Sequence, residues 1–179
     1  MGDENPATVR VEISTAEGRF VIEVYPEAAP LSAQNFLAYV EQNFMGQGNA
    51  YRITTLTNEP EKPFPIEVIQ FGWNDPVTGP TAAPFAPIAH ESTEQSGLRH
   101  KQGAVSTARF ARDTGGYGFF ICMRDEPELD FGGRRHADGF GFSAFGRIVS
   151  GWQTVQRIFA HAQEQDYLTH PIGMVAQRL

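Results

Sequence analysis

The chain begins with two alternations of apolar and polar residues, which are typical of half-buried β-strands. The first is TVRVEIS, residues 8–14, and the second is GRFVIEVY, residues 18–25. The intervening residues, TAEG, are small or polar types that turns favour. Because successive side chains on a strand point to opposite faces, each segment offers one apolar face to a core. We predict a β-hairpin at the start of the fold.

Two amphipathic helices are predicted further along the chain. The first begins at Pro30, since the first turn of a helix tolerates proline. Its apolar side chains recur at helical spacing, at Ala33, Phe36, Leu37, Val40 and Phe44. The second follows Ser150, which we interpret as its N-cap. One face of this second helix carries Trp152, Val155 and Phe159.

Short segments rich in β-branched and aromatic residues predict the remaining strands. They are AYRITT, IEVIQFGW, GAVSTAR, GFFICM, SAFGRIV and IGMVAQ. The stretch from Asn74 to about Gly97 is too irregular for a regular element. Many short strands, two helices and no βαβ rhythm favour an antiparallel sheet or barrel with helices packed on it. We find no repeat or linker, so residues 1–179 are interpreted as one domain, with residues 1–7 as a flexible tail.

Composition narrows the possible partners. The 179 residues are 41% hydrophobic, enough for a substantial core, and carry a net charge of −7 with no block of Lys or Arg. This disfavours nucleic acids and anionic membranes, whose binding requires clustered cations. No run of about 18 apolar residues predicts a membrane span. We expect a soluble protein. The sequence leaves its compartment open between the cytoplasm and, if a signal peptide has been removed, the periplasm.

Several kinds of chemistry lack the residues that they require. The single cysteine, Cys122, excludes an internal disulfide and is interpreted as a buried structural thiol. No Gly-x-Ser-x-Gly elbow is present, and the Asp-Phe-Gly of residues 130–132 occurs without the other kinase motifs. The five histidines show no metal-ligand spacing; they are His90, His100, His136, His161 and His170. We predict no metal and no cofactor.

Arg52 is the charged residue in AYRITT, where it is either solvated or a placed hydrogen-bond donor. A resemblance favours the second interpretation, because the chain resembles the cyclophilins, particularly the bacterial ones. The similar segments occur in the family's order across nearly the whole chain. They are EGRFVIEVYPEAAPLSAQNFLAYV, YRI, VIQFG, GLRHKQGAVSTAR, GFFI, LDFGG and DGFGFSAFGRIVSG. The resemblance implies a closed eight-stranded antiparallel barrel, capped by two α-helices, with a substrate groove on its outer face.

The activity implied by this resemblance is peptidyl-prolyl cis-trans isomerisation. Arg52 matches the family's catalytic arginine, and Gln70 matches the glutamine that supports it. The resemblance also implies an apolar pocket for the proline ring, formed by Val68, Phe120, Leu129 and Phe142. Because neighbours on a strand alternate, Phe120 rather than Phe119 is expected to face the groove. Ala108 and Arg109 match the strand that binds the substrate backbone.

The chain also departs from the family pattern. Arg52 and Gln70 are 18 positions apart, more than is usual, so LTNEPEKPFP, residues 56–65, is interpreted as an inserted loop. RRHA, residues 134–137, lengthens a second loop. At the groove, Glu67 and Glu128 replace aromatic residues and Gly118 replaces a glutamine. These changes predict weak cyclosporin binding and reduced catalysis.

Three functions remain open from the sequence. The first is a prolyl isomerase that assists protein folding, acting on proline-containing peptides and on unfolded or flexible protein segments, as a monomer. The second is a catalytically weak or inactive module of the same fold that binds proline-containing segments. The third is a different barrel that carries a small ligand inside, lined by GFFICM and SAFGRIV.

Overall fold

The strands form a closed antiparallel barrel in a computed structural model that describes residues 7–42, 48–73 and 85–179. The strand order around the barrel is β1-β2-β7-β5-β6-β4-β3-β8, and all eight neighbouring pairs are antiparallel. The strands are β1 Val9–Thr15, β2 Gly18–Val24, β3 Gly48–Thr54, β4 Val68–Trp73, β5 Ala104–Thr107, β6 Phe119–Cys122, β7 Ser143–Ser150 and β8 Tyr167–Arg178. This confirms the predicted fold class.

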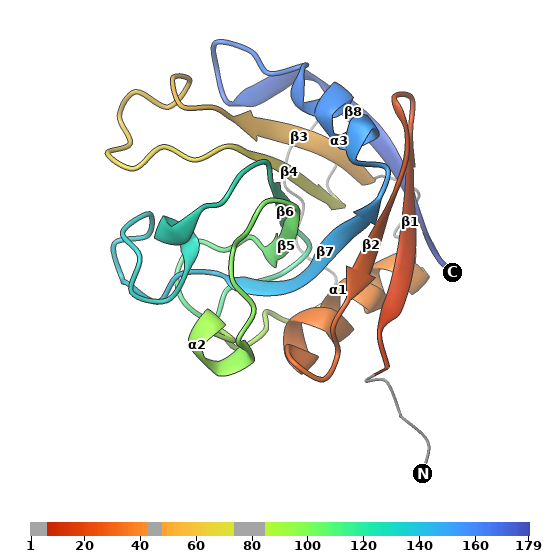
Figure 1. The fold of residues 1–179 in the computed structure, drawn as a ribbon, viewed down its shortest axis with the longest axis vertical. Helices are drawn as coiled ribbons and strands as arrows, with labels where there is room; N and C mark the ends of the chain where they lie inside the picture. The colour runs from red at the N-terminus through yellow and green to blue at the C-terminus, as the bar shows by residue number, and fades with distance from the viewer. Residues whose placement is uncertain (1–6, 43–47, 74–84) are drawn as a thin grey trace.

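Two helices cover the barrel, as predicted. Figure 1 shows α1, Pro30–Gln42, and α3, Trp152–Phe159, at opposite ends of the barrel. Ser150 is not the N-cap of α3 because it ends β7, and Gly151 takes that position with a φ of 81°. A Cβ at Gly151 would lie 2.3 Å from the carbonyl oxygen of Arg19, so this close approach requires glycine.

The structure also contains short elements that the hydrophobic pattern did not predict. Helix α2, Thr93–Ser96, lies in the stretch that we interpreted as irregular. It is held by a capping box in which Ser92 and Gln95 bond reciprocally to each other's backbone amides. A 3₁₀ turn, η2, spans Pro127–Leu129. Residues 1–6 of the predicted tail lie outside the described residues. So does Phe44, which we expected on the first helix.

Aromatic side chains fill the inside of the barrel. The ring of Phe119 lies 5.1 Å from that of Phe36 and 5.3 Å from that of Phe71, measured between centroids. Phe36 also packs 5.1 Å from Phe145, so α1 closes this end of the core. Such a packed interior argues against the interpretation as a barrel that carries a small ligand.

A second, smaller apolar cluster lies on the outer face of the barrel wall. Phe119 and Ile121 belong to the interior, whereas the alternate residues Phe120 and Cys122 belong to this outer cluster. Its buried members are Ile66, Val68, Ala104, Phe120, Cys122 and Leu129, and Ala108 and Phe142 pack against them. Cys122 is fully buried, and burial raises the pKa of its thiol well above the ordinary value. It is therefore a structural thiol, as predicted.

Two long loops project from the same side of the barrel. Figure 1 shows the β3–β4 loop in yellow and the β6–β7 loop in cyan on that side, away from both chain termini. These loops contain the two segments that we interpreted as lengthened, residues 56–65 and 134–137. In the described parts of the chain, no helix is long and apolar enough to cross a membrane.

Candidate functional site

Arg52, Gln70 and Phe120 are neighbours in one row across the barrel wall. Arg52 on β3 pairs with Gln70 on β4, and Gln70 pairs with Phe120 on β6. On the other side of β3, Arg52 faces Tyr167 of β8. Directly opposed residues of antiparallel strands share a face, so the row lies on the outside with the second apolar cluster. The sheet itself brings the predicted donor, its glutamine and the predicted pocket together.

The guanidinium of Arg52 is held from three directions. Nε donates to Oδ2 of Asp166 at 2.8 Å, Nη1 donates to Oε1 of Gln70 at 3.1 Å, and Nη2 donates to Oε1 of Glu59 at 2.5 Å. The ring of Tyr167 lies 5.5 Å from the guanidinium carbon. Three of the five N–H groups are thus used, and two have no partner among the described residues. The side chain keeps 19% of its surface exposed.

The charge of Arg52 is secure in this setting. Burial lowers its pKa, but the hydrogen bond to Asp166 and the carboxylates of Glu59 and Asp166 outweigh that effect. The net result is a pKa above the ordinary value for arginine. Arg52 therefore remains a cationic donor at every pH at which the fold is stable.

The amide of Gln70 has a defined orientation. Its Oε1 accepts from Arg52, and its Nε2 donates to the hydroxyl of Tyr51 at 2.6 Å. Tyr51 lies at a bulge of β3, where the register shifts between Ala50 and Arg52. A Cβ at Gly118 would lie 3.3 Å from the Tyr51 hydroxyl. Gly118 therefore leaves room for this tyrosine.

Phe120 is held between two other rings at the centre of the outer apolar cluster. His100 stacks on it at 5.9 Å with an interplanar angle of 15°, and Phe142 meets it edge-on at 5.6 Å. Val68 and Leu129 complete the cluster and are almost fully buried. The four predicted pocket residues are thus brought together beside Arg52 and Gln70.

His100, which stacks on Phe120, is the middle member of a buried Ser-His-Asp hydrogen-bond network. His100 Nδ1 lies 2.8 Å from Asp130 Oδ1, and His100 Nε2 lies 2.8 Å from Ser106 Oγ. Ser106 and His100 expose 0% and 1% of their surface, so no substrate can reach the hydroxyl. The arrangement of residues matches a hydrolase triad, but its burial makes it a support for the aromatic ring.

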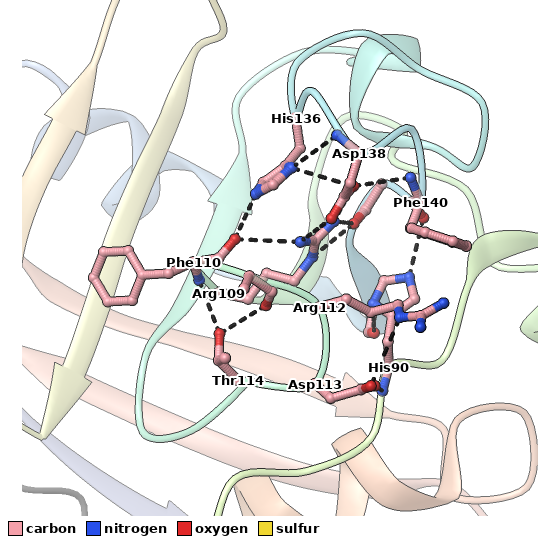
Figure 2. A network of polar contacts seen from close by, with 12 residues as sticks. His90, Arg109, Phe110, Arg112, Asp113, Thr114, His136, Asp138 and Phe140 are labelled. Carbon is pink, nitrogen blue, oxygen red and sulfur yellow. Dashed lines mark hydrogen bonds and ion pairs between the residues drawn. The ribbon is translucent and has the colours of Figure 1, made fainter.

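Arg109 adopts a different role from Arg52. Its guanidinium donates to both carboxylate oxygens of Asp138, at 2.8 and 2.9 Å, and to the carbonyls of Phe110 and Gly141. Figure 2 shows this guanidinium enclosed by the network, with the ring of Phe110 directed away from it. The side chain is only 3% exposed and lies 5.0 Å from the Phe142 ring. Arg109 thus fixes the loop that carries Phe142.

The backbone beside Arg109 is still available. The Ala108 amide bonds to the Gly118 carbonyl at 2.9 Å. Within the described residues, neither the Ala108 carbonyl nor the Arg109 amide has a hydrogen-bond partner. The two groups belong to one trans peptide unit and point to opposite sides of the chain, so only one of them can face a given extended peptide. The Ala108 amide already bonds to Gly118 on one side, which leaves the Arg109 amide directed to the other.

Glu67 and Glu128, which we interpreted as acidic replacements, are paired locally. Glu128 accepts two side-chain hydrogen bonds from Arg134, both of 2.9 Å, and this pairing lowers the pKa of the carboxyl. Glu67 lies 3.7 Å from Arg124. Each carboxylate therefore has an arginine beside it at the edge of the site.

Sequence reasoning missed several residues that surround Arg52. Asp166 is 114 positions from Arg52 and Arg135 is 76 positions from Glu59, so no spacing rule relates them. Tyr51 lies in the YRI segment, where we noted it only as the residue before Arg52 and assigned it no role. Among the described residues, no group of three His, Cys, Asp or Glu is placed to hold a metal ion.

Comparison with known proteins agrees with this geometry. The family model "Cyclophilin type peptidyl-prolyl cis-trans isomerase/CLD" matches residues 8–177. A peptidyl-prolyl cis-trans isomerase of Acinetobacter baylyi is 31% identical over 153 residues, which cover 85% of this chain and 72% of that protein. A peptidyl-prolyl cis-trans isomerase of Streptomyces antibioticus is 30% identical over 149 residues, which cover 83% and 81%.

Solved structures share the fold at lower identity. The crystal structure of a Cryptosporidium parvum cyclophilin type peptidyl-prolyl cis-trans isomerase aligns with a TM-score of 0.70 and 20% identity, covering 96% of this chain and 98% of that chain. A second crystal structure of that protein, in the presence of the dipeptide Ala-Pro, aligns with a TM-score of 0.68. The chain belongs to the family of cyclophilin-type peptidyl-prolyl cis-trans isomerases. The predicted family and enzyme class are confirmed.

Proposed function

We propose that Arg52 and Gln70 catalyse rotation about Xaa-Pro peptide bonds held on the outer face of the barrel. The observation that carries this proposal is the pair of unused N–H groups on Arg52, in register with Gln70 and beside the Phe120 cluster. Among the described residues of the row, Arg52 is the one cation, and it is 19% exposed beside the apolar cluster.

The reaction requires a donor aimed at the prolyl nitrogen. Peptide rotation has a barrier of roughly 20 kcal/mol because amide resonance must be broken. In the twisted state the nitrogen regains its lone pair, so a donor there binds the twisted state better than either planar isomer. Arg52 supplies this donor, and Gln70 keeps the guanidinium oriented. The step makes and breaks no covalent bond, so neither a metal nor a cofactor takes part.

The proline ring lies against the outer apolar cluster. Phe120, 4% exposed, forms the floor and the partly buried Phe142 forms the rim, while Val68 and Leu129, 2% and 0% exposed, form the wall that packs behind them. A ring held there stays fixed beside Arg52 while the preceding residue rotates, so the donor keeps its orientation toward the prolyl nitrogen. The chain at Ala108 and Arg109 lies along the substrate backbone, and the Arg109 amide, which has no partner among the described residues, donates to it.

The clients that fit this site are exposed proline-containing segments of unfolded or flexible chains. The exposed part of this outer wall receives extended peptide more readily than a compact protein surface, and a closed barrel offers no strand edge for self-association. We therefore propose that residues 1–179 act as one domain and as a monomer. Glu67 and Glu128 each lie beside an arginine at positions where we expected aromatic residues. We therefore propose that cyclosporin binds only weakly.

The test is the cis-trans exchange rate of a panel of Xaa-Pro peptides, measured by NMR with the wild-type protein and with Arg52→Ala. We expect acceleration by the wild type and a loss of about 100-fold or more with the variant. Circular dichroism of both proteins controls for folding. Binding of the peptides without acceleration by the folded wild type would contradict the proposal and identify a binding module.

A further inference from the structure

The carboxylate of Glu59 lies between two arginines from different parts of the chain. Its Oε1 accepts from Nη2 of Arg52 at 2.5 Å. Nη2 of Arg135 donates to both carboxylate oxygens of the same residue, at 2.9 and 2.8 Å. The Glu59 side chain is only 1% exposed. A buried carboxylate between two guanidinium groups is costly to form unless its partners keep their positions.

Glu59 and Arg135 belong to the two segments that we interpreted as additions to the family pattern. Glu59 lies in residues 56–65, and Arg135 lies in residues 134–137. Further contacts join these segments, since Arg135 donates to the Phe64 carbonyl at 3.2 Å and Arg134 lies 4.2 Å over the Phe64 ring. The two additions to the chain therefore pack against each other directly beside Arg52.

The loop that carries Glu59 is fixed by its neighbour Asn58. The Asn58 side chain accepts from the Thr55 amide at 2.8 Å and donates to the carbonyls of Ile53 and Gln163, at 2.8 and 3.2 Å. These bonds tie the loop to β3 and to the segment before β8. The carboxylate of Glu59 is consequently presented to Arg52 from a rigid support.

The same contacts extend to the predicted proline pocket. The Arg135 amide donates to the Glu128 carbonyl at 3.1 Å, and Leu129, which follows, is a buried member of the Phe120 cluster. Glu59 thus connects the donor on β3 with the loop that forms one wall of the pocket. A donor helps the twisted state most when its direction is fixed before the reaction.

We propose that Glu59, held by Arg135, is a positioning residue that fixes the plane of the Arg52 guanidinium toward the prolyl nitrogen. The inference rests on the proposed catalytic role of Arg52. Asp166, Gln70 and Glu59 hold Nε, Nη1 and Nη2, so the directions of the two remaining N–H groups are set. Without Glu59 the guanidinium keeps its charge but gains rotational freedom.

The primary experiment compares Glu59→Gln with Glu61→Gln. The amide keeps the size of the side chain and removes its charge, and Glu61 is an exposed glutamate of the same loop. We expect Glu59→Gln to lower kcat for a tetrapeptide about tenfold with KM changed less than about twofold, since oriented binding in the transition state is lost. Glu61→Gln is expected to match the wild type.

A double-substitution cycle tests the role of Arg135 and provides a second variant if Glu59→Gln is poorly folded. Arg135→Gln removes the support of Glu59 and is expected to lower kcat about threefold. The double variant is expected to equal Glu59→Gln within about twofold, because residues that act through one contact are not additive. Additive losses in the double variant would contradict a shared mechanism.

A spectroscopic measurement separates positioning from general stability. The NMR signals of the Arg52 guanidinium N–H groups report its rotation, and we expect faster rotation in Glu59→Gln with the barrel unchanged by circular dichroism. Unchanged or faster catalysis by folded Glu59→Gln would overturn the inference while leaving the activity of the wild type and the loss in Arg52→Ala intact. An inactive wild type would instead contradict the proposed function.

Discussion

Arg52 and Arg109 lie on the same face of the barrel, and both are bound by carboxylates, yet their donors are used differently. Every N–H of Arg109 has an acceptor in the protein, namely the Asp138 carboxylate and the carbonyls of Phe110 and Gly141. Within the described residues, only three of the five N–H groups of Arg52 have acceptors. The Arg109 side chain is 3% exposed and the Arg52 side chain is 19% exposed, so the arginine with free donors is also the more accessible one.

The comparison shows that proximity to the groove does not by itself give a side chain a role in the reaction. A guanidinium whose five donors are satisfied can only hold structure, and Arg109 holds the 138–141 segment under Phe142. A guanidinium fixed at three points with two donors left can both stay in place and bind substrate. The number of uncommitted N–H groups therefore distinguishes the proposed donor from the structural arginine.

Replacing Arg52 with lysine gives the largest expected effect. Arg52→Lys keeps the positive charge but replaces a planar fork by a single ammonium, which cannot bond Asp166, Gln70 and Glu59 while reaching the substrate. We expect kcat/KM for Xaa-Pro tetrapeptides to fall about 100-fold. Exchange spectroscopy on one peptide series measures this loss. Activity within about threefold of the wild type would show that charge alone suffices.

Replacing Arg109 with lysine is expected to act on stability instead. Arg109→Lys loses the paired bonds to Asp138 and the contact with the Phe142 ring, at a cost of about 1–3 kcal/mol. Because the backbone of residue 109 is unchanged, we expect kcat/KM to fall less than about fivefold. Urea unfolding and peptide exchange measure the two effects. A loss of activity as large as that of Arg52→Lys would erase the distinction between the two arginines.

The outline of this site could be predicted because strand patterns and ordered motifs are local. Alternation in GFFICM predicted that Phe119 and Phe120 face opposite sides, the resemblance assigned Phe120 to the outer face, and the structure has them so. Motif order placed Arg52 and Gln70 on adjacent strands, and the register pairs them directly. Helix α2 was missed because four residues are too few for a helical period, although Ser92 and Gln95 carry a capping-box signature.

The partners of the two arginines could not be predicted. Asp138 is 29 positions from Arg109, and Asp166 is 114 positions from Arg52. Glu59 is near Arg52 in sequence, but it belongs to a loop without periodicity. The same loop contains a second glutamate, Glu61, which is exposed in the structure. Only the folded path of that loop decides which glutamate is buried against Arg52.

The smallest expected effect concerns the pH dependence of the Arg109 contact. The hydrogen bonds from Arg109 are the main cause that lowers the pKa of Asp138 to about 2, from 3.8. Since the folded state binds the proton more weakly than the unfolded state, this contribution to stability is complete above about pH 4 and is lost as the pH falls through about 2. His136 also lies 3.1 Å from this carboxylate.

The variant Asp138→Asn isolates that contribution, because an amide does not titrate. We expect the free energy of unfolding to be lower in Asp138→Asn than in the wild type at pH 5 to 7, and the difference to shrink between about pH 4 and pH 2. Urea unfolding at several pH values measures it. A difference that is constant down to pH 2 would show that Asp138 stabilises the loop through shape and hydrogen bonding alone, and the contrast with the charged surroundings of Arg52 would then rest on geometry.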